Sequence, residues 1–272
     1  ANATVVVTAY HVAYDGLSHT AAIASITGVN GETGATVGTV DVAGTTHTSA
    51  GSYNDSWSFT GAANYNNIAA TPIADLIDKA SATVVVNAYH VTYDGQPHTA
   101  TVASISGVNG ETGATVGTVN VSGTTHSNAG TYNDTWSFTG TANYNNIAST
   151  PITDVIDRAN ANVVVTAYHV TYDGQAHTAA VTSISGVNGE TGAAVGTVNV
   201  TNTTHSDAST YNADSWTFTG AGNYSDIAAQ TITDIVDKAT ATVTITPYTV
   251  TYDGGAHTAT YTIAGVNGES GN

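Results

Sequence analysis

The sequence predicts an all-β protein made of small tandem units, and three observations lead to this prediction. Glycine, threonine, serine, asparagine and valine abound, whereas leucine, glutamate, lysine and arginine, which favour helices, are scarce. Short β-prone runs alternate with turn-forming residues along the chain. A Tyr-Asp-Gly motif also recurs at a nearly constant spacing, as expected when one structural unit is repeated.

The Tyr-Asp-Gly motif defines the repeat. Its tyrosines are Tyr14, Tyr93, Tyr172 and Tyr252, which lie 79, 79 and 80 residues apart. The first two copies match without gaps at about 60 of 79 positions. This period is longer than the roughly 20–50 residues of most solenoid repeats and suits a small independent β domain. We therefore predict domains at 1–79, 80–158 and 159–238, followed by a partial fourth copy at 239–272.

Each copy divides into apolar runs separated by turn signals. In the first copy we expect strands at Thr4–Tyr10, Thr20–Ile26, Thr36–Val42, Ser56–Thr60 and Thr71–Ile77. The Asp-Gly and Asn-Gly pairs ending at Gly16 and Gly31 favour tight turns with positive φ. Trp57 and Phe59 lie two residues apart, so we expect them on one strand face, in the core. The pattern is typical of a small immunoglobulin-like β-sandwich, with a β-grasp-like sheet as the alternative.

One inserted residue in the third copy tests the strand assignment. Ala213 lies between Tyr211 and Trp216, whereas Tyr53 and Trp57 of the first copy are one residue closer together. An extra residue within a regular strand would turn every later side chain to the opposite face. We therefore expect a loop or a β-bulge before the tryptophan.

The connections between copies are short. PIADLIDKASATVVV, PITDVIDRANANVVV and TITDIVDKATATVTI each join the end of one copy to the start of the next. An aspartate, a basic residue and an alanine separate two β-prone runs, without a linker rich in glycine, proline or serine. We therefore expect an extended, semi-rigid rod. With strands of about 10 residues, each domain would be about 35 Å long and three domains roughly 100 Å.

Two stretches carry a resemblance to a known family, together with the Tyr-Asp-Gly turn. They are SAGSYNDSWSFTGAANYN (Ser49–Asn66) and NAGTYNDTWSFTGTANYN (Asn128–Asn145). They resemble the YDG-type, mostly-β glycine-rich modules found in tandem in large bacterial surface proteins and adhesins. The Ala-Gly-x-Tyr step is similar to the tyrosine corner of immunoglobulin-like sandwiches. The resemblance covers the three complete copies and implies a surface-exposed, repetitive stalk without catalytic residues.

Composition restricts the partners and the location of the chain. Three basic residues stand against twenty acidic ones, giving a formal charge of −17. This charge repels phosphate backbones and anionic membranes, so we expect no nucleic-acid binding. No run of about 18 apolar residues occurs, so we expect no membrane insertion. Cysteine and methionine are absent, which is common in bacterial extracellular proteins, and we expect an extracellular or cell-surface location.

A polar cluster surrounds the first Tyr-Asp-Gly motif. It consists of His11, Tyr14, Asp15 and His19, and it recurs in the next two copies, whereas Thr249 replaces the first histidine in the fourth. Acid–base catalysis needs a histidine and a carboxylate in one pocket, but an enzyme rarely strings identical sites along a chain. We therefore expect no enzymatic activity. The alternative for the cluster is a β-turn whose aspartate caps backbone amides while histidine and tyrosine pack across it.

Aspartates near the connections are candidate metal ligands. They are Asp75, Asp78, Asp154, Asp157, Asp234 and Asp237. Calcium binds carboxylates and backbone carbonyls, so these aspartates are candidate ligands of a structural calcium ion; otherwise they form solvated acidic faces, and we expect no other cofactor. The histidine spacing matches no standard zinc signature.

Tyrosines in asparagine-rich loops are candidate binding residues. Tyr65, Tyr144 and Tyr224 lie in ANYNNI, ANYNNI and GNYSDI. Tyrosine and asparagine together suit carbohydrate or protein contacts. In the alternative, the tyrosine plugs the end of the sandwich and the asparagines shape the loop.

Two functions are compatible with these features. The first is a structural stalk or spacer in a large bacterial cell-surface or extracellular fibrous protein, adhesin-like, where the repeats supply length and semi-rigidity. The second is a multivalent adhesin in which each copy presents the same carbohydrate- or protein-binding loop. The expected partners are neighbouring repeats of the same chain, other copies in a filament, and a glycan or host-cell-surface ligand.

Overall fold

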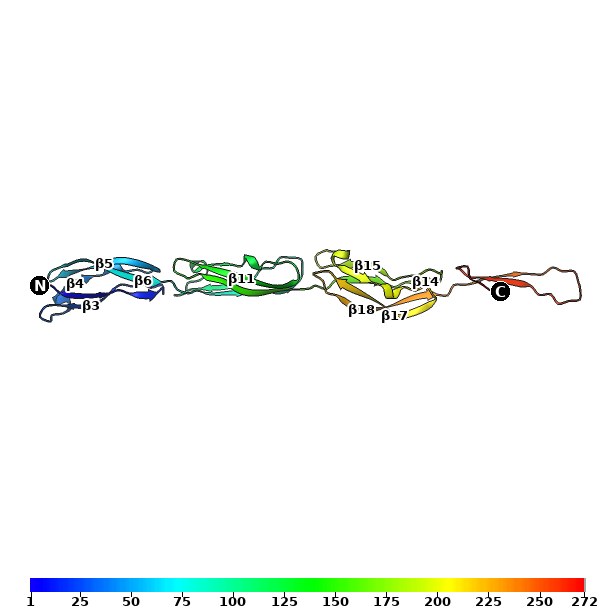
Figure 1. The fold of residues 1–272 in the computed structure, drawn as a ribbon, viewed down its shortest axis with the longest axis horizontal. Helices are drawn as coiled ribbons and strands as arrows, with labels where there is room; N and C mark the ends of the chain where they lie inside the picture. The colour runs from blue at the N-terminus through cyan, green and yellow to red at the C-terminus, as the bar shows by residue number, and fades with distance from the viewer. Residues whose placement is uncertain (272) are drawn as a thin grey trace. The chain divides into compact units, whose positions relative to one another are not determined.

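The computed structural model describes residues 1–271, which form an all-β chain (Figure 1). The strands of the first repeat are β1 (Thr4–Thr8), β2 (His11–Ala13), β3 (Ala22–Thr27), β4 (Gly38–Asp41), β5 (Gly51–Gly61) and β6 (Ile68–Asp78). Two 3-10 turns, η1 (Gly34–Thr36) and η2 (Ala43–Thr45), flank β4. Within residues 1–271 there is no α-helix, and so none that is long and apolar enough to cross a membrane.

Four strands of the first repeat form a mixed sheet, and the other two pair separately. The order in the larger sheet is β2-β6-β5-β4. β2 runs parallel to β6, whereas β6 pairs with β5 and β5 with β4 in antiparallel fashion. β1 and β3 form a two-stranded antiparallel sheet. Figure 1 shows β5 and β6 as the long neighbouring strands of this repeat.

The second and third repeats have an equivalent topology, which confirms the tandem repeat. The second contains β7 (Thr83–Asn87), β8 (His90–Thr92), β9 (Thr101–Ser106), η3 (Gly113–Thr115), β10 (Gly117–Asn120), η4 (Ser122–Thr124), β11 (Gly130–Gly140) and β12 (Ile147–Asp157). The third contains β13 (Asn162–Thr166), β14 (His169–Thr171), β15 (Ala180–Ser185), η5 (Gly192–Ala194), β16 (Gly196–Asn199), η6 (Thr201–Thr203), β17 (Ser209–Gly220) and β18 (Ile227–Asp237). The larger sheets are ordered β10-β11-β12-β8 and β14-β18-β17-β16. The partial copy has one sheet of β19 (Thr242–Thr246), β20 (Thr260–Ala264) and β21 (Ser270–Gly271).

The chain divides into two compact units, and the division runs through the second repeat. The first unit comprises Ala1–Tyr89, Pro97–His126 and Thr131–Asp154, and the second comprises His90–Gln96, Ser127–Gly130 and the chain from Val155 onward. The connection after the first repeat therefore lies inside the first unit, and the connections after the second and third repeats lie inside the second. The predicted boundaries of independent domains, after residues 79, 158 and 238, remain a prediction.

The core of the first repeat lies between its two sheets. Exposed and partly buried residues alternate along β1, and the partly buried Val5 and Val7 point to the same side. These side chains pack against a buried cluster of Val37, Trp57 and Phe59. Trp57 is 9% exposed and Phe59 is 1% exposed, which confirms that both belong to the core.

The turns match the prediction more closely than the strand boundaries do. Gly16 and Gly31 have φ angles of 79° and 85°, in the region that glycine adopts without strain. The run predicted to end at Tyr10 is instead divided between β1 and the short strand β2. At Tyr10 the backbone leaves the smaller sheet, since its carbonyl accepts a 3.0 Å hydrogen bond from the amide of Leu76 in β6. Local β propensity predicts an extended run but not which sheet the run joins.

The inserted Ala213 forms the predicted β-bulge. β17 has 12 residues, whereas β5 has 11. Tyr211 pairs with Asp234 and Asp214 pairs with Ile232, with a register shift between the two pairs. The first repeat pairs the equivalent residues without a shift at this point. The bulge therefore absorbs the extra residue and restores the register before the tryptophan.

Candidate functional site at the repeat junctions

A set of long-range contacts joins the first repeat to the second, and we call it the first junction. Tyr14, which follows β2, is held by a 2.8 Å hydrogen bond from its amide to the carbonyl of Asp78. Its hydroxyl donates a 2.6 Å hydrogen bond to Oε1 of Glu111 in the second repeat. Its ring meets the ring of Tyr144 edge-on, with centroids 5.7 Å apart and an interplanar angle of 83°. The tyrosine of the Tyr-Asp-Gly motif is therefore an inter-repeat contact.

Tyr144 closes the end of the second repeat from the other side of this junction. Its side chain is fully buried. Its hydroxyl accepts a 2.9 Å hydrogen bond from the amide of Val108 and donates to Oε2 of Glu111. Gly107 leaves room for this hydroxyl, because a Cβ atom there would lie 2.1 Å from it. One carboxylate thus accepts hydrogen bonds from two tyrosines, one in each repeat.

Backbone contacts hold the connecting segment in the same junction. The amide of Ala50 donates a 2.9 Å hydrogen bond to Oδ1 of Asn143. The amide of Ala80 donates to the carbonyl of Asn143 at 2.9 Å, and the amide of Asn145 donates to the carbonyl of Ala80 at 2.9 Å. The connection is therefore hydrogen-bonded to the loop of the following repeat.

Apolar packing is continuous through the first junction. Tyr14 and Ile77 of the first repeat belong to one buried cluster with Ala80, Phe138 and Tyr144 of the second. Separating the repeats would expose this cluster to water, which is unfavourable in proportion to the apolar area exposed.

The second junction, between the second and third repeats, repeats these contacts. The Tyr93 hydroxyl donates a 2.7 Å hydrogen bond to Oε1 of Glu190. The ring of Tyr93 meets Tyr224 edge-on, with centroids 5.7 Å apart and an angle of 81°. The amide of Ala129 donates a 2.8 Å hydrogen bond to Oδ1 of Asn223. The junction is therefore a property of the repeat and not of one pair of neighbours.

Hydrogen bonding and burial set the ionisation of the junction groups. Hydrogen bonds from Tyr14 and then Tyr144 lower the pKa of the Glu111 carboxyl, and a bond from Tyr93 is the main cause that lowers the pKa of Glu190 to about 2. Burial, followed by the bond to Glu111, raises the pKa of Tyr144 to about 12. At neutral pH the carboxylates are charged and the tyrosines neutral, which are the states that favour these bonds.

These shifts predict alkaline unfolding. Burial is also the main cause that raises the pKa of Tyr10, Tyr89 and Tyr168 to about 12. Tyrosine in an unfolded chain ionises near pH 10, so the stability from these groups is complete below about pH 10 and is lost as pH rises through about 12. We expect phenolate absorbance and loss of β circular dichroism to develop in one cooperative step across this range. A smooth tyrosine titration with unchanged circular dichroism would contradict this.

The polar cluster around the first motif divides between two contacts. Asp15 Oδ1 accepts a 2.8 Å hydrogen bond from the amide of Leu17 and lies 3.0 Å from His19 Nε2. The Leu17 amide is the main cause that lowers the pKa of Asp15. His11 Nε2 lies 2.6 Å from Oδ2 of a different carboxylate, Asp78. The aspartate caps the turn, as the β-turn alternative predicts, and the absence of enzymatic activity remains a prediction.

The aspartates predicted as calcium ligands lie in two different environments. Asp75 and Asp78 are three apart on β6, so their side chains point to opposite sides. Asp75 is 1% exposed, and its Oδ1 accepts a 2.9 Å bond from the amide of Tyr10. Asp78 is exposed and pairs with His11. Equivalent environments surround Asp154, Asp157, Asp234 and Asp237, whose partners are Tyr89, His90, Tyr168 and His169.

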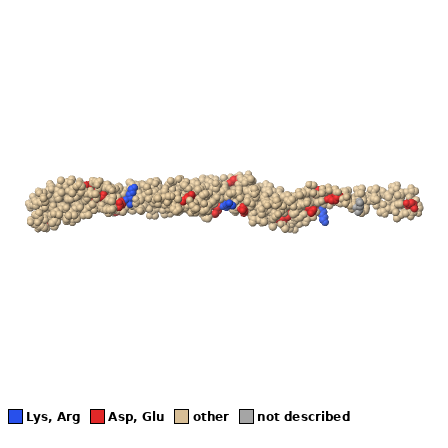
Figure 2. Space-filling model, viewed as in Figure 1, with Lys and Arg blue, Asp and Glu red and all other residues tan. Residues whose placement is uncertain are grey.

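Neither Asp75 nor Asp78, nor their equivalents in the other repeats, lies within a larger group of possible metal ligands among residues 1–271. In the described part of the chain, no three His, Cys, Asp or Glu side chains are grouped so that they could hold a metal ion. Acidic groups are scattered over the face seen in Figure 2, with few basic groups among them.

Calcium binding remains a prediction and is tested by thermal unfolding. A single site filled at 100 times its Kd would add about 2.7 kcal/mol of stability. The calcium hypothesis therefore predicts a clear rise in Tm with calcium that an equal concentration of magnesium does not produce. Equal Tm values in calcium, magnesium and chelator would contradict it.

The three loop tyrosines differ in exposure. Tyr144 and Tyr224 are 0% and 1% exposed, so their rings offer no face to a ligand. Both tyrosines are buried inside their loops, as expected if this tyrosine closes the end of the repeat and does not bind a ligand. Tyr65 is half-buried, and its hydroxyl donates a 2.9 Å hydrogen bond to Oε2 of Glu32 in its own repeat. Ligand binding by these loops remains a prediction.

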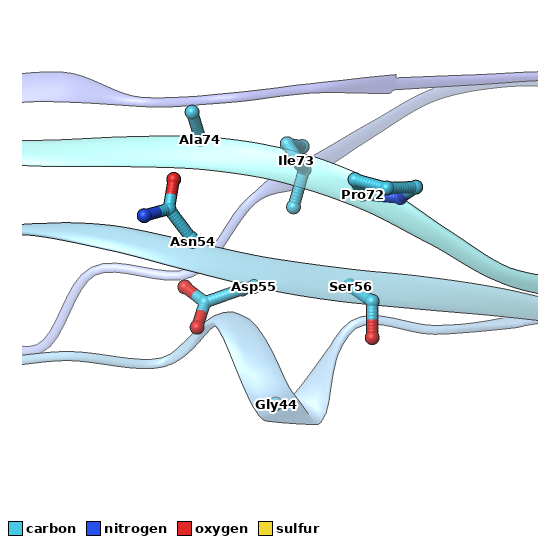
Figure 3. A pocket seen from close by; sticks show the side chains of 7 residues that line it. All are labelled: Gly44, Asn54, Asp55, Ser56, Pro72, Ile73 and Ala74. Carbon is cyan, nitrogen blue, oxygen red and sulfur yellow. The ribbon is translucent and has the colours of Figure 1, made fainter.

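A shallow hollow of about 700 Å³ lies beside β5, β6 and the turn η2 (Figure 3). Its lining residues are Gly44, Asn54, Asp55, Ser56, Pro72, Ile73 and Ala74. The carboxylate of Asp55 is already engaged, because its Oδ2 lies 2.9 Å from His47 Nε2. Small-molecule sites are usually enclosed and apolar with a few convergent polar groups, and this open hollow lacks those features.

The contacts that sequence reasoning missed are those of the glutamate in the Asn-Gly-Glu step. Glu32, Glu111, Glu190 and Glu269 are the equivalent residues of the four copies. This glutamate recurs in every copy, including the partial one, and that recurrence is the sequence feature that could have indicated its structural role. Comparison of the chain with protein-family models finds no match, and comparison with curated proteins finds none either.

Proposed function

We propose that these repeats are structural spacers of a large bacterial cell-surface or extracellular fibrous protein and supply length and semi-rigidity. The observation that carries the proposal is the recurrence of one junction, with its Tyr–Glu hydrogen bond, edge-on tyrosine pair and Ala–Asn bond. Bending at a junction would break directional bonds and expose apolar rings at once, so each junction favours one geometry.

We also propose that each repeat is a small immunoglobulin-like sandwich similar to the YDG-type glycine-rich modules. Packing of Val5 and Val7 from the smaller sheet against Phe59 of the larger one supports this. The Tyr53 hydroxyl donates a 2.6 Å hydrogen bond to the carbonyl of Ser49, four residues upstream. A tyrosine corner makes the same kind of bond back to the upstream backbone.

Small-angle X-ray scattering on the 272-residue chain tests the spacer proposal. A compact globule of this length would have a radius of gyration of about 18 Å. A row of three domains roughly 100 Å long would give about 30 Å or more. A value near 18 Å would overturn the proposal.

Semi-rigidity is tested by weakening the junction bonds. The double variant Asn143→Ala/Asn223→Ala removes one side-chain acceptor from each of the first and second junctions. The amides of Ala50 and Ala129 then lose their hydrogen bonds to Oδ1 of these asparagines. We expect its scattering to report a broader range of end-to-end distances. Asn64→Ala is the matched control, because this loop asparagine belongs to the first repeat. A glycan array and a filament assay on the same samples would test carbohydrate binding and self-association.

A further inference from the structure

At the first junction, one tyrosine from each repeat and one glutamate form a compact group. The hydroxyls of Tyr14 and Tyr144 donate to different oxygens of the Glu111 carboxylate, and all three residues belong to the first compact unit. The two rings lie edge-on with centroids 5.7 Å apart, which is a contact distance for aromatic pairs. Two phenol groups from neighbouring repeats therefore meet beside one carboxyl group.

The two rings of this group are shielded from water, whereas the carboxylate is not. Tyr14 and Tyr144 are buried, and Glu111 is partly exposed. A radical formed on either ring is therefore kept away from solvent and from other chains. A proton taken up by Glu111 passes to water at neutral pH, because a carboxyl group is ionised there.

This arrangement suits oxidative coupling of the two phenols. A one-electron oxidant removes one electron from Tyr14 while the hydroxyl proton moves to Glu111, and the same step on Tyr144 gives a second phenoxyl radical. A carbon–carbon bond then forms between the ring carbons next to the hydroxyl-bearing carbons. Each of these carbons loses its proton and each oxygen regains one, so both rings become phenols again. In total, two electrons and two protons leave and one dityrosine remains.

The second junction contains an equivalent group within the second compact unit. Tyr93 and Tyr224 both hydrogen-bond to Glu190. Their rings lie at 81° with centroids 5.7 Å apart, and Glu190 is partly exposed like its equivalent in the second repeat. The same coupling therefore fits both junctions.

We propose that the tyrosine pair of each junction is a modification site, at which a one-electron oxidant joins neighbouring repeats through a dityrosine cross-link. The shared glutamate accepts the phenolic protons one after the other. The junction selects these pairs, because two reactants held in contact react without the entropic cost of meeting. The proposal depends on the junction contacts and not on the spacer function.

The test oxidises the full chain with a photoactivated ruthenium trisbipyridyl complex and persulfate, and then digests the unfolded product with trypsin. The only basic residues of the chain are Lys79, Arg158 and Lys238. Trypsin therefore releases one peptide per repeat. We expect a first product in which 1–79 is joined to 80–158, and a second in which 80–158 is joined to 159–238. Each bond should lower the summed peptide mass by two hydrogen atoms, and fragmentation should place it at the paired tyrosines.

The two junctions serve as controls for each other. The variant Tyr14→Phe keeps the ring but lacks the phenol, so it should lose the first product and keep the second. The variant Tyr93→Phe should show the reverse. Glu111→Gln removes the proton acceptor and should lower the yield of the first product, relative to the second, about tenfold or more. Circular dichroism checks that each variant is folded before oxidation.

Mixing isotopically labelled and unlabelled chains before oxidation separates coupling within a chain from coupling between chains. We expect both products to carry a single isotopic composition. Products that join labelled to unlabelled peptides, bonds confined to other tyrosines, or a first product that persists in Tyr14→Phe would overturn the proposal. An unchanged yield in Glu111→Gln would overturn the role of the glutamate.

Discussion

Replacing Tyr144 with alanine is expected to lower the free energy of unfolding by about 3–5 kcal/mol. The side chain is fully buried, so its removal leaves a cavity beside the ring of Tyr14. The Val108 amide also loses its acceptor, and the Glu111 carboxylate loses one of its two tyrosine donors. Both effects act at the junction, so the first two repeats should also unfold less cooperatively.

The loss is measured by urea unfolding with tryptophan fluorescence. Each complete repeat has one tryptophan, at Trp57, Trp136 and Trp216, and single-tryptophan variants report on each repeat separately. Tyr65→Ala is the matched control, because the same residue of the first repeat is only half-buried. Its loss should be clearly smaller. Equal losses for the Tyr144 and Tyr65 variants would contradict a stabilising role for the junction.

Gly95→Ala is expected to lower the free energy of unfolding by about 2–5 kcal/mol. Gly95 has a φ of 78°, where an alanine is strained by about 1–2 kcal/mol. In addition, its Cβ would lie 2.3–2.6 Å from side-chain atoms of Asn188 in the third repeat. Relieving that overlap requires the second junction to shift, which adds about 1–3 kcal/mol.

The variant Gly189→Ala separates the cost of backbone strain from the cost of the overlap with Asn188. Gly189 has a nearly equal φ of 82°, but a Cβ there meets nothing within 4 Å. We therefore expect only the backbone strain, and urea midpoints from Trp136 and Trp216 fluorescence should fall less than in Gly95→Ala. If both variants lose the same stability, the contact with Asn188 contributes nothing.

Much of the local structure could be predicted from the residues. The Asp-Gly and Asn-Gly turns, the core positions of Trp57 and Phe59, and the bulge at Ala213 depend on nearest neighbours and on the two-residue period of a strand. The strand β2 could not be predicted, since three residues carry too little pattern. It exists because they lie beside β6.

The junction was only partly predictable. The Tyr-Asp-Gly motif was recognisable as a repeated turn, but its tyrosine was assigned to packing across that turn. The hydroxyl of Tyr14 instead reaches Glu111, 97 residues further along the chain. The aspartates near the connections remain predicted metal ligands, and the β6 strand directs Asp75 and Asp78 to opposite sides.

By itself, the sequence determined the period of the repeat, its β character, its turns and the buried face of the strand that carries Trp57 and Phe59. These follow from spacing and composition, which act over a few residues. Only the tertiary structure decided which tyrosine meets which glutamate and where the Asn-Tyr loops are covered. Those contacts depend on the order of strands in the sheets, because a partner about 80–100 residues away is brought near only when the intervening strands have paired.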